Sequence, residues 1–126
     1  MKQFCEQVFE DFIVGTAVVF TSPVFEERMG LSDRLAIQVV ADQVTGTTPS
    51  LTVQVEHGSD GRNWAAKNGS AEINAATLSA TITNNLTGVE PGTNPSHGRV
   101  RLRIALAGTN PQANVKIYVT GRDRVP

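Results

Sequence analysis

The side chains that could carry a catalytic reaction are few and widely spaced in this chain of 126 residues. The two histidines, His57 and His97, have no second histidine or carboxylate at the spacing of a metal site. His57, Ser59 and Asp60 are the residue types of a hydrolytic triad, but neighbours within one turn point in different directions. We therefore expect no catalytic residue, no metal site and no bound cofactor, and predict that the protein is not an enzyme.

The single cysteine, Cys5, lies among apolar residues with no Lys, Arg or His beside it, which favours a small core residue over a reactive thiol. One cysteine can form neither an internal disulfide nor a cysteine-based zinc cage. The N-terminal segment carries Glu6, Glu10 and Asp11 where a secretion signal needs an unbroken apolar stretch. No apolar run approaches the length of a membrane span, so we expect a protein made in a cytoplasm without a membrane partner.

Three arginines, Arg99, Arg101 and Arg103, alternate with apolar residues and therefore share one face of a predicted strand. Such a row can follow a phosphate backbone when a ring such as Trp64 or Tyr118 stacks a base. The net charge is −1, however, whereas nucleic-acid-binding modules are normally basic. We interpret the row as a ladder of ion pairs, across strands or between subunits, and do not expect nucleic acid as a partner.

Acidic and basic residues are distributed unequally along the chain. Residues 1–60 contain nine Asp and Glu against three Lys and Arg, and residues 61–126 contain three against eight. If the two halves form separate surfaces, the protein is an electric dipole that can dock head to tail on its own copies. The alternative is that strands from the two halves interleave and their charges neutralise locally.

Alternation of apolar and polar residues predicts strands over most of the chain. The pattern occurs in residues 33–42, 50–57, 76–83, 99–108 and 114–122, and a short apolar run covers 16–21. Short strands at about ten-residue spacing, each apolar on one face, are typical of a sandwich of two sheets. The predicted fold class is all-β, a two-sheet antiparallel β-sandwich of the jelly-roll type, with an open barrel as the alternative.

The N-terminal segment differs from the rest of the chain. Phe4, Val8 and Phe12 are four residues apart, which is the spacing of a short amphipathic helix. A helix of three turns is unstable alone in water, so its aromatic side chains must lie on this domain or on a neighbour. We divide the chain into an N-terminal amphipathic segment or arm, 1–15, and a single β-sandwich domain, 16–126.

Turn residues divide the predicted strands. The tetrapeptide Gly-Thr-x-Pro occurs at 46–49, 92–95 and 108–111. Proline cannot donate to a strand ladder and pushes the preceding residue into extended geometry, so the first and last copies are predicted to be hairpin corners. The second copy lies in the aperiodic stretch 84–98, and so long a loop in a compact domain is usually functional or ordered by a partner.

A second kind of turn is predicted after the strand at 50–57. Asp60-Gly61 supplies the residues that a left-handed turn requires. We expect this turn to return Trp64 toward the core.

The segments GTTPSLTVQVEHGSDGRNW and GRVRLRIALAGTNPQANVKIYVTGR together resemble small jelly-roll virion proteins of tailed bacteriophages, including capsid cement and decoration proteins. The resemblance covers roughly residues 33–66 and 97–122. It implies a non-enzymatic structural protein on the capsid exterior of a phage-like particle. Its expected partners are the major capsid protein or another virion protein, and further copies of itself in a homo-oligomer such as a trimer.

An assembly protein needs an interface, and the candidate residues come from the aromatic segment, the arginine row and the 84–98 loop. They are Phe4, Phe9, Phe12, Arg99, Arg101, Arg103, Pro95 and His97. The alternative function is that of a carbohydrate- or ligand-binding β-sandwich module associated with a phage tail. Sugar binding needs exposed aromatic rings, and outside the N-terminal segment only Trp64 and Tyr118 can supply them.

Overall fold

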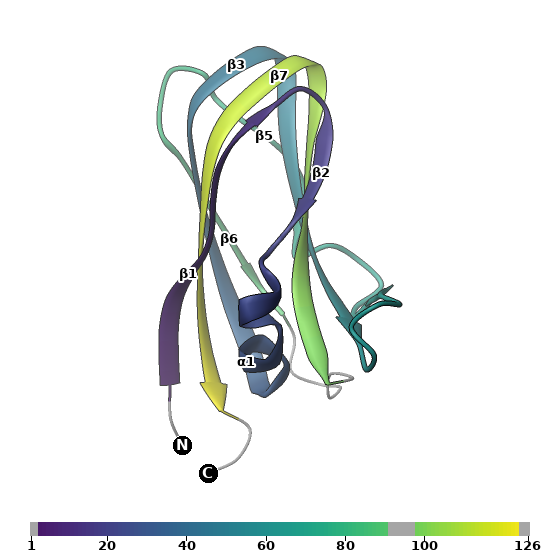
Figure 1. Cartoon of the computed structure of the whole chain (residues 1–126). Helices are drawn as coiled ribbons and strands as arrows, with labels where there is room; N and C mark the ends of the chain where they lie inside the picture. The colour runs from purple at the N-terminus through teal and green to yellow at the C-terminus, as the bar shows by residue number, and fades with distance from the viewer. Residues whose placement is uncertain (1–2, 91–97, 124–126) are drawn as a thin grey trace.

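A computed structural model describes residues 3–90 and 98–123 (Figure 1). The elements are β1 (Gln3–Val14), β2 (Ala17–Phe20), the 3-10 helix η1 (Pro23–Phe25), α1 (Glu26–Gly30), β3 (Ser32–Gly58), β4 (Ala65–Ala66), β5 (Ile73–Thr77), β6 (Asn84–Val89) and β7 (Arg99–Asp123). In the described part of the chain, no helix has the length and apolar character needed to cross a membrane.

Two long strands, β3 and β7, form the frame of the molecule. They pair antiparallel from Ser32 opposite Asp123 to Gly58 opposite Arg99. Both strands bend sharply midway, at the end of the molecule opposite α1 (Figure 1). The bends fold one continuous sheet into two layers, which confirms the predicted all-β, antiparallel, jelly-roll-like fold.

Each layer contains one half of both long strands. The first layer has the order β1, β7 (112–123), β3 (32–45) and β6. In the second layer β2 pairs with β7 (99–107), which pairs with β3 (50–58), and this half of β3 also pairs with β4 and β5. Strands β1 and β2 therefore form one side of the sandwich, and β4, β5 and β6 form the other.

The two Gly-Thr-x-Pro corners lie against each other, with Thr47 opposite Thr109 in the strand register. Gly46 and Gly108 have φ values of 111° and 131°, which favour glycine. A Cβ on Gly46 would lie 2.7 Å from the carbonyl oxygen of Asn110. The prediction of hairpin corners is wrong here, because the strand entering each corner pairs with the other long strand and not with the strand that leaves it. The third copy, at 92–95, lies outside the described residues.

The helix expected near the N-terminus is also wrong, since residues 3–14 form strand β1. Positions four apart share one face of a strand as well as of a helix, so the aromatic spacing did not separate the two structures. The pairing with β7 shifts register between Gln7 and Phe9. This irregularity puts Phe4 and Val8 in the core but turns Phe12 outward.

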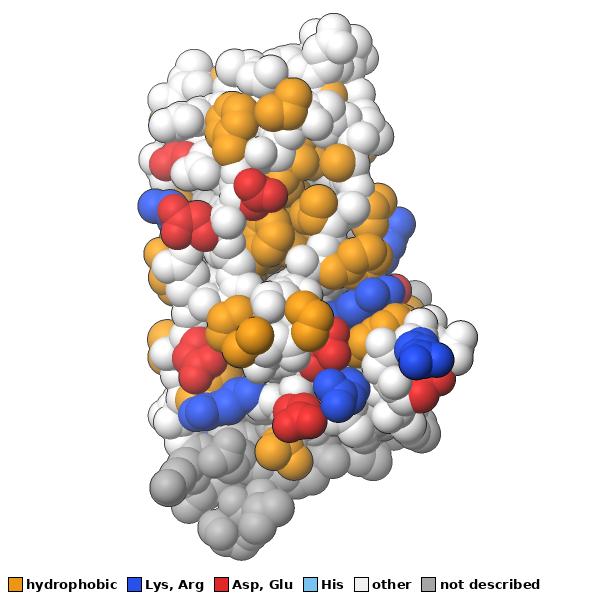
Figure 2. Space-filling view, in the orientation of Figure 1, with side chains coloured by type: hydrophobic (Ala, Val, Ile, Leu, Met, Phe, Trp, Pro, Cys, Tyr) orange, Lys and Arg blue, Asp and Glu red, His pale blue; other side chains and the backbone are white. Residues whose placement is uncertain are grey.

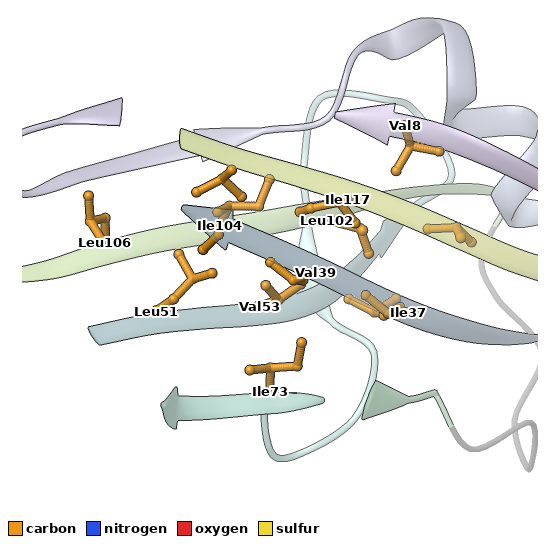
Figure 3. Close-up of a cluster of buried hydrophobic side chains, with 14 of the residues drawn as sticks. Val8, Ile37, Val39, Leu51, Val53, Ile73, Leu102, Ile104, Leu106 and Ile117 are labelled. Carbon is orange, nitrogen blue, oxygen red and sulfur yellow. The ribbon is translucent and has the colours of Figure 1, made fainter. Parts of the chain in front are cut away.

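The core lies between the two layers and contains the alternating apolar residues predicted for the long strands. The buried sets are Leu35, Ile37 and Val39; Leu51, Val53 and Val55; Val100, Leu102, Ile104 and Leu106; and Val115, Ile117 and Val119. In Figure 3, labelled side chains from both halves of β3 and β7 point toward one another. The short helix adds Met29, which is fully buried.

The structure of residues 73–90 differs from the prediction of one strand at 76–83. Strand β5 ends at Thr77 and β6 begins at Asn84, so only the first two residues of the predicted strand are in a strand and residues 78–83 contain none. The Asn84 side chain holds this segment, because its Nδ2 donates to the Ser79 and Ala41 carbonyl oxygens and its Oδ1 accepts from the Ser79 N–H. Ile82, expected on the inner face, is consequently 68% exposed.

Candidate interaction surface

Arg101 is the centre of a cluster on the outer face of the second layer. Its Nε lies 2.9 Å from Oε1 of Glu56, the residue opposite it on β3. The guanidinium carbon lies 3.8 Å from the ring centroid of Phe20 and 4.5 Å from that of Trp64. Strands β2, β3 and β7 and the turn before β4 therefore meet at one arginine.

The turn at 59–64 is what brings Trp64 to this cluster. The Asp60 Oδ1 accepts hydrogen bonds of 2.9 Å from the backbone N–H groups of Arg62 and Asn63. These bonds stabilise the carboxylate and so lower the pKa of Asp60 from 3.8 to about 2, and the bond from Asn63 has the largest effect. The chain then returns as β4, which pairs with the end of β3, so the predicted tight turn is confirmed, but the expectation that it returns Trp64 to the core is wrong, because the ring lies on Arg101 at the outer face.

The Arg101 guanidinium is fixed in place by these contacts. The rings of Phe20 and Trp64 lie against it and its Nε is bonded to Glu56, while 22% of the side chain stays exposed. Among the described residues, none accepts a hydrogen bond from its terminal amino groups. A guanidinium held in this way is preorganised to bind a carboxylate or phosphate through two parallel hydrogen bonds.

The other two arginines of the row have different surroundings. Arg99 lies 3.5 Å from Glu26 and 3.4 Å from Glu27 of the short helix. Arg103 stands opposite Phe20 in the register of β2 and β7 and makes no ion pair with a described residue. Within the chain, the interpretation as ion pairs is confirmed for Arg99 and Arg101, and both pairs join an acid from the first half to a base from the second.

The three candidate phenylalanines do not form a single surface. Phe4 is only 6% exposed, and the Arg28 guanidinium carbon lies 4.6 Å from the centroid of its ring. Phe9 is half-buried against the core, and Phe12 is 44% exposed. The expectation that Phe4 contributes to an outer interface is therefore wrong, because its side chain fills the core of its own subunit. Pro95 and His97 lie outside the described residues.

Exposed apolar side chains mark the side of the sandwich formed by β1 and β2. They are Phe12 and Val14 on β1 and Val18 and Phe20 on β2. In the described part of the sheet, each of these strands pairs only with β7, so one edge of each is unpaired. Figure 2 shows hydrophobic side chains gathered along the middle of this side.

Sequence reasoning did not assign Phe20 and Glu56 to the interface. Both alternate outward on their strands, so a local signal was present. Their proximity to Arg101 depends on which strands lie side by side, and no local pattern gives that.

The outer face of the first layer carries a shallow depression of about 210 Å³ around Tyr118. Its lining includes Gln38 and Thr87, and a neighbouring hollow of about 140 Å³ shares Ala36 and Thr120 with it. Most of its polar groups are amides and hydroxyls, with Arg34 and Arg122 at one end of the neighbouring hollow.

Cys5 also lines this depression and is exposed, so its predicted place in the core is wrong. The reason is the strand geometry of β1, which puts Cys5 on the opposite face from Phe4. His57 is half-buried at the end of β3. Within residues 3–90 and 98–123, no three His, Cys, Asp or Glu side chains are grouped to hold a metal ion.

Comparisons with known proteins show the fold. No protein-family model matches the chain. No curated protein matches it either. The chain is similar to part of VP2 in the infectious bursal disease virus subviral particle, with a TM-score of 0.50 and 14% identity, over 95% of this chain and 30% of that one.

A second similar structure is the CBM22-1 xylan-binding domain of Xyn10C from Paenibacillus barcinonensis. The TM-score is 0.51 and the identity 11%, over 97% of this chain and 87% of that domain. The chain thus shares a β-sandwich fold with a domain of a viral particle protein and with a carbohydrate-binding module.

Proposed function

We propose that this protein is a non-enzymatic structural component of a phage-like particle, a decoration or cement protein that binds the outside of the capsid and stabilises it through contacts between subunits. The observation that carries this proposal is the side formed by β1 and β2. This side combines strand edges that pair with no described strand, exposed apolar residues and the fixed guanidinium of Arg101. Aromatic residues and arginine are the residue types that dominate the energy of protein interfaces.

The fold is compatible with this role, because VP2 forms a subviral particle and contains a domain of similar architecture. The chain spans about 30% of the length of VP2, so the likeness concerns the fold of one domain only. The resemblance of the two quoted segments to small phage virion proteins supports the same proposal.

The energetics favour a protein that acts in many copies. Fully burying a ring such as Phe12 or Phe20 contributes about 1.5–3 kcal/mol. One such contact gives weak binding, but repeated contacts on a particle raise the overall affinity when the geometry allows simultaneous engagement. The major capsid protein, or another virion protein of the shell, is the proposed partner.

The experiment is a binding assay on virus-like particles isolated from cells that express the full chain. We expect the protein to sediment with the particles, and the double variant Phe12→Ser/Phe20→Ser to remain unbound. Ile82→Ser is the matched control, because Ile82 is an exposed apolar residue on the segment between β5 and β6. If the double variant binds as strongly as the control, the proposed surface is wrong.

A second candidate function is carbohydrate binding, and the depression around Tyr118 favours it. A depression lined by an aromatic ring together with amide and hydroxyl side chains is suited to a sugar ring. The similarity of the fold to that of a xylan-binding domain supports this candidate.

Calorimetric titration with xylo-oligosaccharides and a glycan array test this candidate. We expect binding that Tyr118→Ala abolishes and Tyr118→Phe retains in part. A protein that binds particles but no glycan on the array is a structural protein only.

A further inference from the structure

Strand β1 carries exposed acidic side chains, whereas the face of β7 that holds the Arg101 cluster has a basic excess, because Glu56 pairs with Arg101 and Arg103 adds a second positive charge. No Lys or Arg occurs between residues 3 and 27. On β1, Glu10 accepts a hydrogen bond from Gln7, and Asp11 is exposed with no ion pair to a described residue. On β7, Arg103 is likewise without an ion pair to a described residue, and no described residue accepts a hydrogen bond from the terminal amino groups of Arg101.

Contacts between the same surface on two copies are disfavoured by charge repulsion. Two β1 edges in contact would bring the carboxylates of Glu10 and Asp11 toward those of the second copy. Two Arg101 clusters in contact would oppose two guanidinium groups. Like charges placed directly opposite each other cost stability, whereas unlike charges attract and set the register. Charge therefore favours contact between β1 of one copy and the Arg101 cluster of another.

The spacing of the residues agrees with this arrangement. Glu10 and Phe12 lie two positions apart on the outer face of β1, next to Lys116 and Asn114 of β7. Arg101 and Arg103 also lie two positions apart on one face of β7. Residues at this interval on a strand are separated by about 7 Å. A carboxylate and a ring on one copy can thus meet a guanidinium and the Phe20 ring on the other.

We propose that β1 of one copy docks on the Arg101 cluster of a second copy, with Glu10 bound by Arg101 and Arg103 and with Phe12 against Phe20. The inference rests on the proposed structural function and names one partner within it, the chain itself. The contact is heterologous, because each copy uses two different surfaces. Such contacts produce rings when the rotation closes and open chains when it does not.

Analytical ultracentrifugation of the full chain over a range of protein and salt concentrations tests the proposal. Two variants each remove one surface: Glu10→Lys/Asp11→Lys changes β1, and Arg103→Glu changes the cluster without touching the Arg101 stack. Circular dichroism checks that both fold. A third protein that carries all three substitutions restores opposite charge across the contact.

We expect the unchanged chain to associate at low salt and to dissociate as salt rises. Each variant alone should associate at least about tenfold more weakly. An equimolar mixture of the two variants should recover association, because the intact β1 of one variant meets the intact cluster of the other and the two reversed surfaces also carry opposite charge. The triple variant should recover association.

Three results would overturn the inference: a chain that stays monomeric at all concentrations, variants that associate like the unchanged chain, or variants that each form dimers alone. A monomeric chain that still sediments with particles refutes self-docking but leaves the proposed function standing. A chain that associates as expected but does not bind particles refutes the function and keeps the contact.

Discussion

The Nζ of Lys67 lies 2.5 Å from Oε1 of Glu90, and both side chains are only 2% exposed. The two residues are held in different layers, since the Lys67 N–H donates to the Val55 carbonyl oxygen and the Glu90 N–H donates to that of Leu35. The ion pair therefore joins the two layers on the side opposite β1 and β2. Removing one partner leaves a buried charge without compensation.

Lys67→Met and Glu90→Gln should each lower the free energy of unfolding by about 3–5 kcal/mol. The double variant Lys67→Met/Glu90→Leu should cost less than either single change, because it removes both charges together. Urea unfolding measures all three. A double variant that is less stable than both single variants would contradict this account of the pair.

The two strand bends depend on glycine. Gly46→Ala and Gly108→Ala should each destabilise the fold by about 1–3 kcal/mol or more, because φ is positive and the new Cβ meets backbone atoms of the facing corner. Gly15 also has a positive φ, but a Cβ at this position would have no atom within 4 Å, so Gly15→Ala should destabilise the fold less than the two corner substitutions. Gly69→Ala, which meets nothing and has no positive φ, is the neutral control. Thermal unfolding of the four variants measures the order of these losses of stability.

Phe4 and Phe12 should respond differently to truncation. Phe4→Ala removes a buried ring and should cost about 3–5 kcal/mol in the free energy of unfolding. Phe12→Ala should leave the stability nearly unchanged and weaken association or particle binding instead. Denaturant unfolding together with sedimentation separates the two effects. Equal losses of stability would show that the exposed ring is part of the core.

The stack around Arg101 can be followed through Trp64, the only tryptophan of the chain. Arg101→Ala should shift its fluorescence to the red and increase quenching by iodide, because the ring loses the guanidinium that covers it. Arg103→Ala should leave the spectrum unchanged. The loss of cation–π contacts should cost about 1–2 kcal/mol. An unchanged spectrum for Arg101→Ala would contradict the stack.

Asp60 should titrate with a pKa of about 2, as measured by the pH dependence of its side-chain NMR signal. Because this pKa is lowered from 3.8 in the folded state, the carboxylate stabilises the fold above pH 3.8, and this contribution is lost as the pH falls through about 2. Asp60→Asn should therefore flatten the pH dependence of stability between these values. A midpoint at the ordinary value would contradict the hydrogen bonds of the turn.

Local patterns predicted the strand faces correctly. Alternation in the long strands placed the sets around Ile37, Val53, Ile104 and Ile117 in the core, because successive side chains of a strand point to opposite sides. The Asp60 turn was also predictable, since its hydrogen bonds connect residues only two and three positions apart.

Other features depended on contacts that are distant in the sequence. The spacing of Phe4, Val8 and Phe12 fits both a helix and a strand, and only the pairing of β1 with β7 decided between them. The glycine and proline of the Gly-Thr-x-Pro segments correctly predicted a change of strand direction. Whether the strand then turns back on itself or continues into the next layer depends on its pairing partner. The grouping of Arg101 with Phe20 and Trp64 likewise follows from strand order.

The sequence by itself determined which side chains of the two long strands face the core, where one tight turn lies and that the fold is an antiparallel sandwich, because these properties arise from the periodicity of the strand and from short-range hydrogen bonds. The tertiary structure alone decided that β3 and β7 bend together, that β1 is a strand and which residues form the interaction surface. These depend on pairing between residues as far apart as Ser32 and Asp123, whose register is set by the packing of the whole core.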